Sequence, residues 1–98
     1  SRLSRGLGDV YKRQATFSFT IDNFTVGAAG DTGVDGHIHY SLNGGSTVMV
    51  YSADDLTLSD LPNGDHSIVF ELVDDAHASL DPAVTATVEF STFDGMVA

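Results

Sequence analysis

Three histidines and one aspartate are the residues of this 98-residue chain whose types and spacing could do chemistry. His37 and His39 are two residues apart in an alternating stretch, so on a β-strand both rings lie on one face and can converge on one metal ion. His77 and Asp75 follow a later stretch of the same kind. Three imidazoles with a carboxylate or a water molecule suit copper, zinc or nickel better than calcium. The alternative is that His37 and His39 are only polar residues on an exposed strand face.

The histidine pair lies in a predicted β-hairpin over residues 36–51. Asn43-Gly44-Gly45 supplies the positive φ angles of a tight turn between two strands. Ile38, Tyr40 and Leu42 alternate with the histidines and predict a buried face. Because this apolar set must face a core, we expect the two histidine rings to point outward.

The rest of the chain predicts more strands and no helix. Alternation, short apolar runs and turn residues at regular spacing predict strands over 16–26, 36–42, 46–51, 56–61, 66–74 and 83–92. A shift of parity near Asp22-Asn23 predicts a bulge or kink there. The predicted core contains Phe17, Phe19, Ile38, Tyr40, Leu42, Ile68, Phe70, Leu72, Val88 and Phe90.

Strand pairing decides which histidines can meet. If residues 36–42 pair antiparallel with 66–74, the start of the first strand lies beside the end of the second. His77, just beyond that end, can then approach the histidine pair. His66, at the far end, lies about 25 Å away, since each residue of a strand advances about 3.3 Å. We expect His66 to hydrogen-bond the backbone of the preceding turn instead.

Other site chemistries have weaker support. Asp31 to Gly36 begins like an EF-hand calcium loop, but Gly33 replaces a ligand and Leu42 stands where the closing glutamate is required. Looser calcium sites would use Asp31, Asp35, Asp74 or Asp75, although turn formation also explains these aspartates. No nucleophile motif such as G-x-S-x-G is present, so we expect no enzyme.

The charge of the chain excludes some partners. The net charge is −10, and all four basic residues lie within residues 1–14, so residues 15–98 contain no Lys or Arg. Such a segment cannot neutralise phosphates, which excludes nucleic acid and anionic membrane surfaces as partners. No apolar run is long enough to insert into a membrane, and the absence of cysteine excludes disulfides and thiolate ligands.

The first residues resemble a sequence of different origin. Ser4 to Gln14, SRGLGDVYKRQ, is similar over its whole length to the translation of a transposase adapter used in sequencing libraries. The resemblance implies that residues 1–14 are not native, and such segments are set aside in fold analysis. We therefore expect residues 1–14 to be disordered or loosely attached and to make no core contacts beyond chance. The alternative is that they pair with the edge left open by the missing strand A, through Val10 and Tyr11.

The stretch from Ile38 to Asp74 resembles the middle strands of a fibronectin type III or related immunoglobulin-like module. The motifs are IHYSLNGGSTVMVY and LTLSDLPNGDHSIVFELVD. The resemblance implies an all-β, antiparallel β-sandwich over residues 15–93, with six strands present and the first strand, A, missing. Residues 94–98 are expected to begin a linker. His66 stands near the position where many such domains have a corner tyrosine.

The resemblance indicates the function less directly than it indicates the fold, because proteins with unrelated roles share this sandwich. The first hypothesis is a non-enzymatic structural or adhesion module of a larger secreted or cell-surface bacterial protein, with other domains of the same chain as partners. The alternative is a copper- or zinc-binding module built on the surface histidines. A third hypothesis is a glycan or protein ligand on the outer surface, with Tyr51 and Phe93 as candidate platforms.

Overall fold

The computed structural model describes residues 2–11, 13–28 and 30–92, and all regular elements in these ranges are β-strands. The strands are β1 (Arg2–Tyr11), β2 (Gln14–Asp22), β3 (Gly36–Leu42), β4 (Thr47–Val50), β5 (Leu56–Leu58), β6 (Gly64–Asp74) and β7 (Ser79–Thr92). The predicted all-β class is confirmed.

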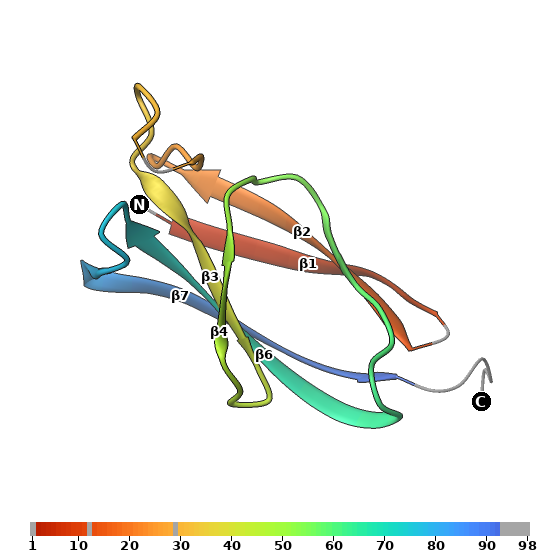
Figure 1. The fold of residues 1–98 in the computed structure, drawn as a ribbon. Helices are drawn as coiled ribbons and strands as arrows, with labels where there is room; N and C mark the ends of the chain where they lie inside the picture. Colours follow the sequence, from red (N-terminus) through yellow and green to blue (C-terminus); the bar gives the residue numbers. More distant parts are fainter. Residues whose placement is uncertain (1, 12, 29, 93–98) are drawn as a thin grey trace.

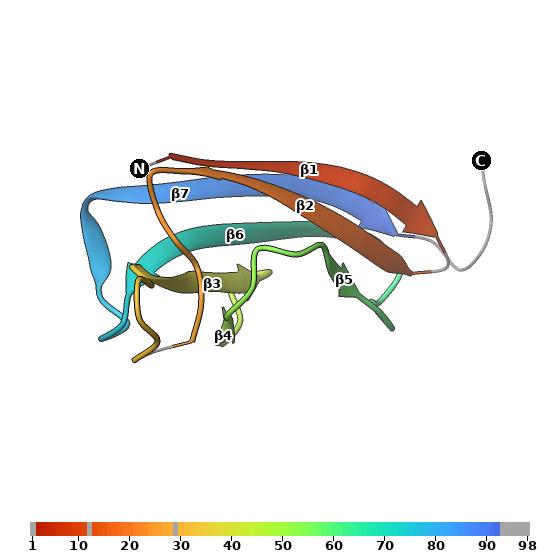
Figure 2. The same cartoon turned by 90° about the horizontal axis from the view of Figure 1, so that it is seen from above.

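The strands form two antiparallel sheets (Figures 1 and 2). One sheet has the order β1-β2-β5, and the other has the order β4-β3-β6-β7. The predicted pairing of the histidine-bearing strand with residues 66–74 is confirmed, because β3 pairs antiparallel with β6 from Gly36↔Asp74 to Leu42↔Ile68. Within the described residues, no helix is long and apolar enough to cross a membrane.

The core lies between the two sheets and is centred on phenylalanine rings. Phe17 of β2 meets Phe70 of β6 and Phe90 of β7 edge-on, with ring centroids 5.3 and 5.4 Å apart. Phe19 packs on the other side of Phe70 at 5.1 Å. The predicted core is confirmed: seven of its ten residues are buried, and Phe19, Tyr40 and Leu42 pack against them while partly exposed.

The expectation that residues 1–14 stand apart from the fold is wrong. Arg2–Tyr11 forms β1, which pairs with β2 from Arg2↔Asp22 to Tyr11↔Gln14, and Gln14 itself belongs to β2. Leu3 is only 7% exposed and is part of the core. The physical reason is that β2 would otherwise present an unpaired row of backbone donors and acceptors, which a neighbouring extended segment can pair with. The described part of the chain therefore has seven strands rather than the predicted six.

Two strand boundaries also differ from the predictions. β2 ends at Asp22 rather than at residue 26, and Asn23, with a left-handed φ of 57°, provides the predicted kink. Phe24 and Val26 still reach the core beyond it. The last strand begins at Ser79 rather than after Pro82, with a register shift opposite Leu72 and Val73. Pro82 is tolerated because β7 is an edge strand, where a missing N–H need not break a ladder. The predicted linker, residues 94–98, lies outside the described residues.

Candidate metal centre

Strand β3 places two imidazoles on the outer face of the four-stranded sheet. Ile38 points into the core, so its neighbours His37 and His39 point away from it, as the alternation predicts. In the ladder with β6, His37 lies opposite Val73 and His39 opposite Glu71. The turn after β3 is also as predicted: Asn43 and Gly44 have φ of 53° and 72°, and Gly45 N–H donates to the Leu42 carbonyl at 2.9 Å.

Gly36 allows the histidine strand to start close to its neighbours. A Cβ at this position would overlap the Val73 carbonyl oxygen and would lie 2.9 Å from both Asp74 Cα and Phe24 Cζ. Only glycine fits between the backbone of β6 and the Phe24 ring. The close approach of the β6 backbone therefore fixes the position of Gly36, directly before His37.

The third histidine is held over β3 by the loop between β6 and β7. Asp74 Oδ1 accepts hydrogen bonds from the amides of Ala76 and Ala78 at 2.9 and 3.0 Å. The His77 N–H donates to the Asp74 carbonyl at 3.0 Å. His77 itself has φ of 65°, a left-handed conformation that is uncommon for residues other than glycine. The loop thus turns sharply and directs the His77 ring back toward the sheet.

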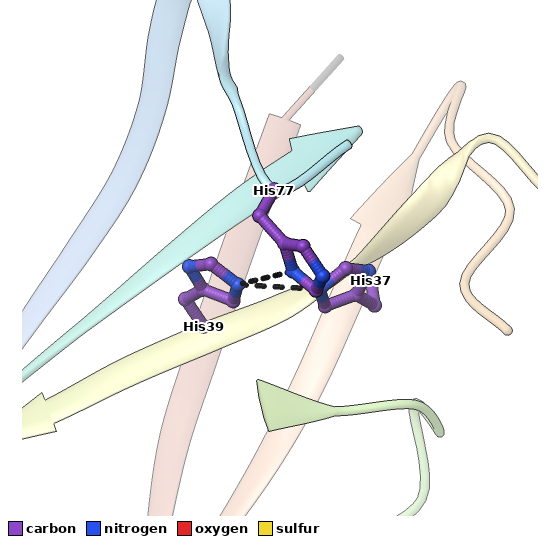
Figure 3. Close-up of side chains that lie close together, drawn as sticks. All are labelled: His37, His39 and His77. Carbon is purple, nitrogen blue, oxygen red and sulfur yellow. Dashed lines mark hydrogen bonds between the residues drawn. The ribbon is translucent and has the colours of Figure 1, made fainter. Parts of the chain in front are cut away.

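The three rings converge on one point (Figure 3). His37 Nε2 lies 3.2 Å from His39 Nε2 and 3.0 Å from His77 Nδ1, and His39 Nε2 lies 3.4 Å from His77 Nδ1. The sequence-based prediction that His77 joins His37 and His39 is confirmed as a geometric arrangement.

Hydrogen bonding alone does not satisfy this triangle of nitrogens. Each nitrogen of a neutral imidazole carries either one hydrogen or one lone pair in the plane of the ring. Among three nitrogens in mutual contact, at least one contact must then join two hydrogens or two lone pairs. A single cation would accept all three lone pairs at once, which makes the triangle better suited to a metal ion than to an empty site.

The dimensions of the triangle match those of a coordinated metal. Imidazole nitrogens bind zinc at about 2.0–2.1 Å, so two nitrogens on a tetrahedral ion lie about 3.3–3.4 Å apart. The observed separations of 3.0–3.4 Å are close to this value. A point about 2.05 Å from all three nitrogens lies about 0.9 Å outside their plane, which leaves space for a fourth ligand.

Burial lowers the pKa of two of the three rings. His37 is fully buried, His39 is half-buried and His77 is exposed. Desolvation lowers the pKa of His37 below its ordinary value, and the neighbouring His39 and His77 lower it further, against a raising effect of Asp75 and Asp74. Desolvation and His77 also lower the pKa of His39, against Glu71. A lowered pKa favours the unprotonated ring, which is the form that binds metal.

Packing rather than hydrogen bonding orients the most buried ring. The second nitrogen of His37, Nδ1, is buried and has no hydrogen-bond partner within the described part of the chain. The Tyr51 ring covers His37, with centroids 4.7 Å apart. Metal-bound histidines usually donate this second proton to an acceptor, and the protein supplies none here. His37 is therefore the ligand whose position depends most on its neighbours.

Asp75 does not join the three histidines. Its Oδ2 accepts a hydrogen bond from the Gly30 amide at 3.4 Å. Within residues 2–11, 13–28 and 30–92, no carboxylate oxygen completes the group of nitrogens. The Asp75 carboxylate contacts the glycine-rich loop before β3 instead, and the role of Asp75 as a ligand stays a prediction.

The predicted calcium ligands form no cluster in the described residues. Asp35 Oδ2 accepts a hydrogen bond from the Thr25 amide at 2.8 Å, and Asp74 caps the β6–β7 loop. Both carboxylates therefore order loops, which is the role that the turn-former interpretation gives them.

His66 has the structural role predicted for it. Its Nε2 lies 2.8 Å from the Pro62 carbonyl and 2.9 Å from Thr92 Oγ1. Its Nδ1 lies 2.9 Å from Asn43 Nδ2, while Asn43 Oδ1 accepts from the Ser67 amide. Both ring nitrogens are thus occupied by a buried network at the other end of β6.

Sequence reasoning missed two residues beside the centre. Tyr51 is predicted only as a glycan platform, and Met49 is not among the predicted site residues. The available signal was parity, because Met49 pairs with His39 and Tyr51 follows two residues later. The other suggested platform, Phe93, lies outside the described residues.

No family model, curated protein or solved structure matches this chain significantly.

Proposed function

We propose that this chain is a β-sandwich module that binds a transition-metal ion through His37, His39 and His77. The observation that carries the proposal is the triangle of three imidazole nitrogens within 3.4 Å of one another. Imidazole suits zinc and copper, and the lack of a carboxylate ligand disfavours calcium and magnesium. The ligands lie on two separate elements, so a bound ion would link β3 to the β6–β7 loop.

At the three-histidine centre, the shape of the surface favours a binding role over an enzymatic one. The hollow beside His39, which His39, Tyr40, Ser41, Thr47, Val69 and Glu71 line, has a volume of about 100 Å³. Pockets for small molecules typically have roughly 300–1,000 Å³. A metal ion fits this surface, whereas a substrate would be held on one side only.

We further propose that the sandwich is of the fibronectin type III kind. The orders β1-β2-β5 and β4-β3-β6-β7 correspond to A-B-E and C′-C-F-G when the strands are lettered along the chain. In this assignment β1 occupies the place of strand A. If residues 4–14 derive from an adapter, they occupy the position that strand A of the native domain would otherwise take. A structural or adhesion role in a secreted protein stays a prediction.

Isothermal titration with zinc and with copper tests the metal proposal. His39→Gln and His77→Asn each remove one ligand, and asparagine tolerates the left-handed φ of residue 77. We expect one ion per chain, and an affinity loss in each variant of more than about a hundredfold, above the loss typical of outer-shell changes. Asp75→Asn is the matched control and should bind like the wild type.

Three results would contradict the proposal. The wild-type chain could bind neither metal, it could bind as tightly without His39 or His77, or the Asp75→Asn variant could lose binding as fully as the histidine variants. Circular dichroism of each variant verifies that the sandwich is retained.

A further inference from the structure

We infer that the thioether of Met49 is the fourth ligand of this centre and that it makes the site selective for copper(I) over zinc. This inference rests on the proposed metal site. It concerns the side of the triangle that faces β4, where Tyr51 packs against His37 and Met49 is the strand partner of His39.

The register of the sheet places Met49 beside the cluster. His39 pairs with Met49 on β4 and with Glu71 on β6, so these three side chains share the outer face. Paired residues of antiparallel strands have Cβ atoms about 4.5–5.5 Å apart. A methionine has three rotatable bonds beyond Cα, so its sulfur can reach over a neighbouring imidazole.

Tyr51 holds the methionine sulfur on the same side. The Tyr51 hydroxyl donates a hydrogen bond to Met49 Sδ at 3.4 Å, while the Tyr51 ring packs on His37 at 4.7 Å between centroids. The two contacts form a chain from the sulfur to the buried ligand histidine. Sulfur has two lone pairs, so it can accept this hydrogen bond and still bind a metal.

The nearby carboxylates do not complete the group of nitrogens. Glu71 flanks His39 on the opposite side, yet its carboxylate does not join the nitrogens within 4.8 Å, and neither does any other carboxylate in the described ranges. Asp75 is engaged by Gly30. Met49 is 42% exposed, so its side chain is not fixed by the core.

The softness of the fourth ligand then determines which metal ion the site prefers. Thioether sulfur is a soft ligand that favours copper(I), whereas zinc is well served by three imidazoles and water. Three nitrogens and one sulfur would enclose copper(I) without a water ligand. The inference thus separates two metals that the histidines alone do not distinguish.

Competition titrations test the inference. Copper(I) affinity is measured anaerobically against bicinchoninate, and zinc affinity against a zinc chelator, in the full chain and in Met49→Leu. We expect Met49→Leu to weaken copper(I) binding by about tenfold or more and to change zinc binding by less than about threefold. Val48→Ala, on the opposite face of the same strand, is the matched control and should change neither. Tyr51→Phe should weaken copper(I) binding less than Met49→Leu does.

X-ray absorption at the copper edge provides a readout that folding alone would not change. A sulfur scatterer should be present in the wild type and absent from Met49→Leu. Equal copper(I) affinity in both proteins, equal losses for both metals, or a spectrum with nitrogen ligands only would overturn the inference while leaving the three-histidine site intact. A zinc loss in Glu71→Gln with no effect of Met49→Leu would assign the fourth position to Glu71 instead. If the wild-type chain binds neither metal, the proposed function fails as well.

Discussion

At the scale of residues, the centre is a group of three imidazoles kept in contact. Like lone pairs repel, so His37, His39 and His77 are held together in the metal-free chain by the elements that carry them. Protonation would add like charges at the same place. Holding the three imidazoles together therefore lowers the free energy of unfolding of the metal-free chain. A bound metal ion would remove this effect, so metal binding and stability are coupled.

The lowered pKa values of His37 and His39 predict that the metal-free chain loses stability in mild acid. Their folded pKa lies below the ordinary value of 6.5, so the unfolded chain binds more protons, and the free energy of unfolding falls as pH drops below about 6.5. The opposing charges are those of Asp74, Asp75 and Glu71. Thermal unfolding followed by circular dichroism with a chelator present, from pH 7 to pH 5, measures the effect.

The double variant His39→Gln/His77→Asn is the reference for this measurement, because the lowering by neighbouring rings is absent from it. We expect its melting temperature to depend less on pH than that of the wild type. Equal dependence in the two proteins, or a wild-type melting temperature that rises on acidification relative to the variant, would contradict the assignment.

Gly36 predicts a sharp effect of a single added methyl group. Gly36→Ala places a Cβ against the Val73 carbonyl and the Phe24 ring, so β3 must move away from β6. We expect a loss of about 1–3 kcal/mol or more in the free energy of unfolding, as for overpacked cores, and a weaker metal site. Gly45→Ala is the control, since its Cβ would meet only the Leu42 carbonyl at 3.1 Å. Urea unfolding that gives the same midpoint for both variants would argue against the close approach.

At the scale of elements, the site depends on one hairpin and one loop. The β3–β4 hairpin supplies His37, His39, Met49 and Tyr51, and the β6–β7 loop supplies His77. Because β3 and β6 are paired along seven residues, the hairpin and the loop are held in fixed register. The ligands are thus positioned by a rigid ladder on one side and by the hydrogen bonds of Asp74 on the other.

Strand β1 predicts that the first residues contribute to stability, whatever their origin. Removing residues 1–11 exposes the edge of β2 and removes Leu3 from the core. Leu3→Ala alone should cost about 2–5 kcal/mol, and the truncation more. Chemical denaturation measures the stability, and size-exclusion chromatography detects association through the open edge. A truncated chain that is monomeric and as stable as the full chain would show that β1 is dispensable.

At the scale of the whole molecule, the sandwich separates two histidine sites. The His66 network lies at one end of β6 and serves the packing of the turn, whereas the three-histidine cluster lies at the other end and faces outward. The net charge of −10 surrounds both with a negative potential that concentrates cations near the surface.

The same charge predicts that salt stabilises the fold. Repulsion among the acidic side chains is screened as the Debye length falls from roughly 30 Å at 0.01 M to roughly 3 Å at 1 M ionic strength. We expect the melting temperature to rise with sodium chloride over this range. The variant Asp54→Asn/Asp55→Asn, which removes two exposed charges between β4 and β5, should show a smaller rise. A melting temperature that falls with salt in the wild type would contradict this prediction.

The sequence by itself determined the features that depend on local periodicity. The alternation of side chains placed His37 and His39 on one face and Ile38 on the other, and Asn43-Gly44 determined the turn that follows. The apolar face that forms the phenylalanine core followed from alternation. These properties belong to neighbouring residues, so no knowledge of distant contacts was needed. The pairing of β3 with β6 was instead implied by the resemblance to a fibronectin type III module.

Only the tertiary structure decided how separate segments meet. The pairing of Arg2–Tyr11 with β2, the left-handed turn at His77 and the contact of Asp75 with Gly30 all depend on which backbone groups lie unpaired nearby. In the sequence, Asp75 and His77 both lie just after the end of β6, so sequence position alone did not distinguish which of them would reach the cluster. A single carboxylate, that of Asp74, fixed the loop by bonding two amides and turned the imidazole of His77 inward, while the carboxylate of Asp75 bonded the neighbouring loop instead.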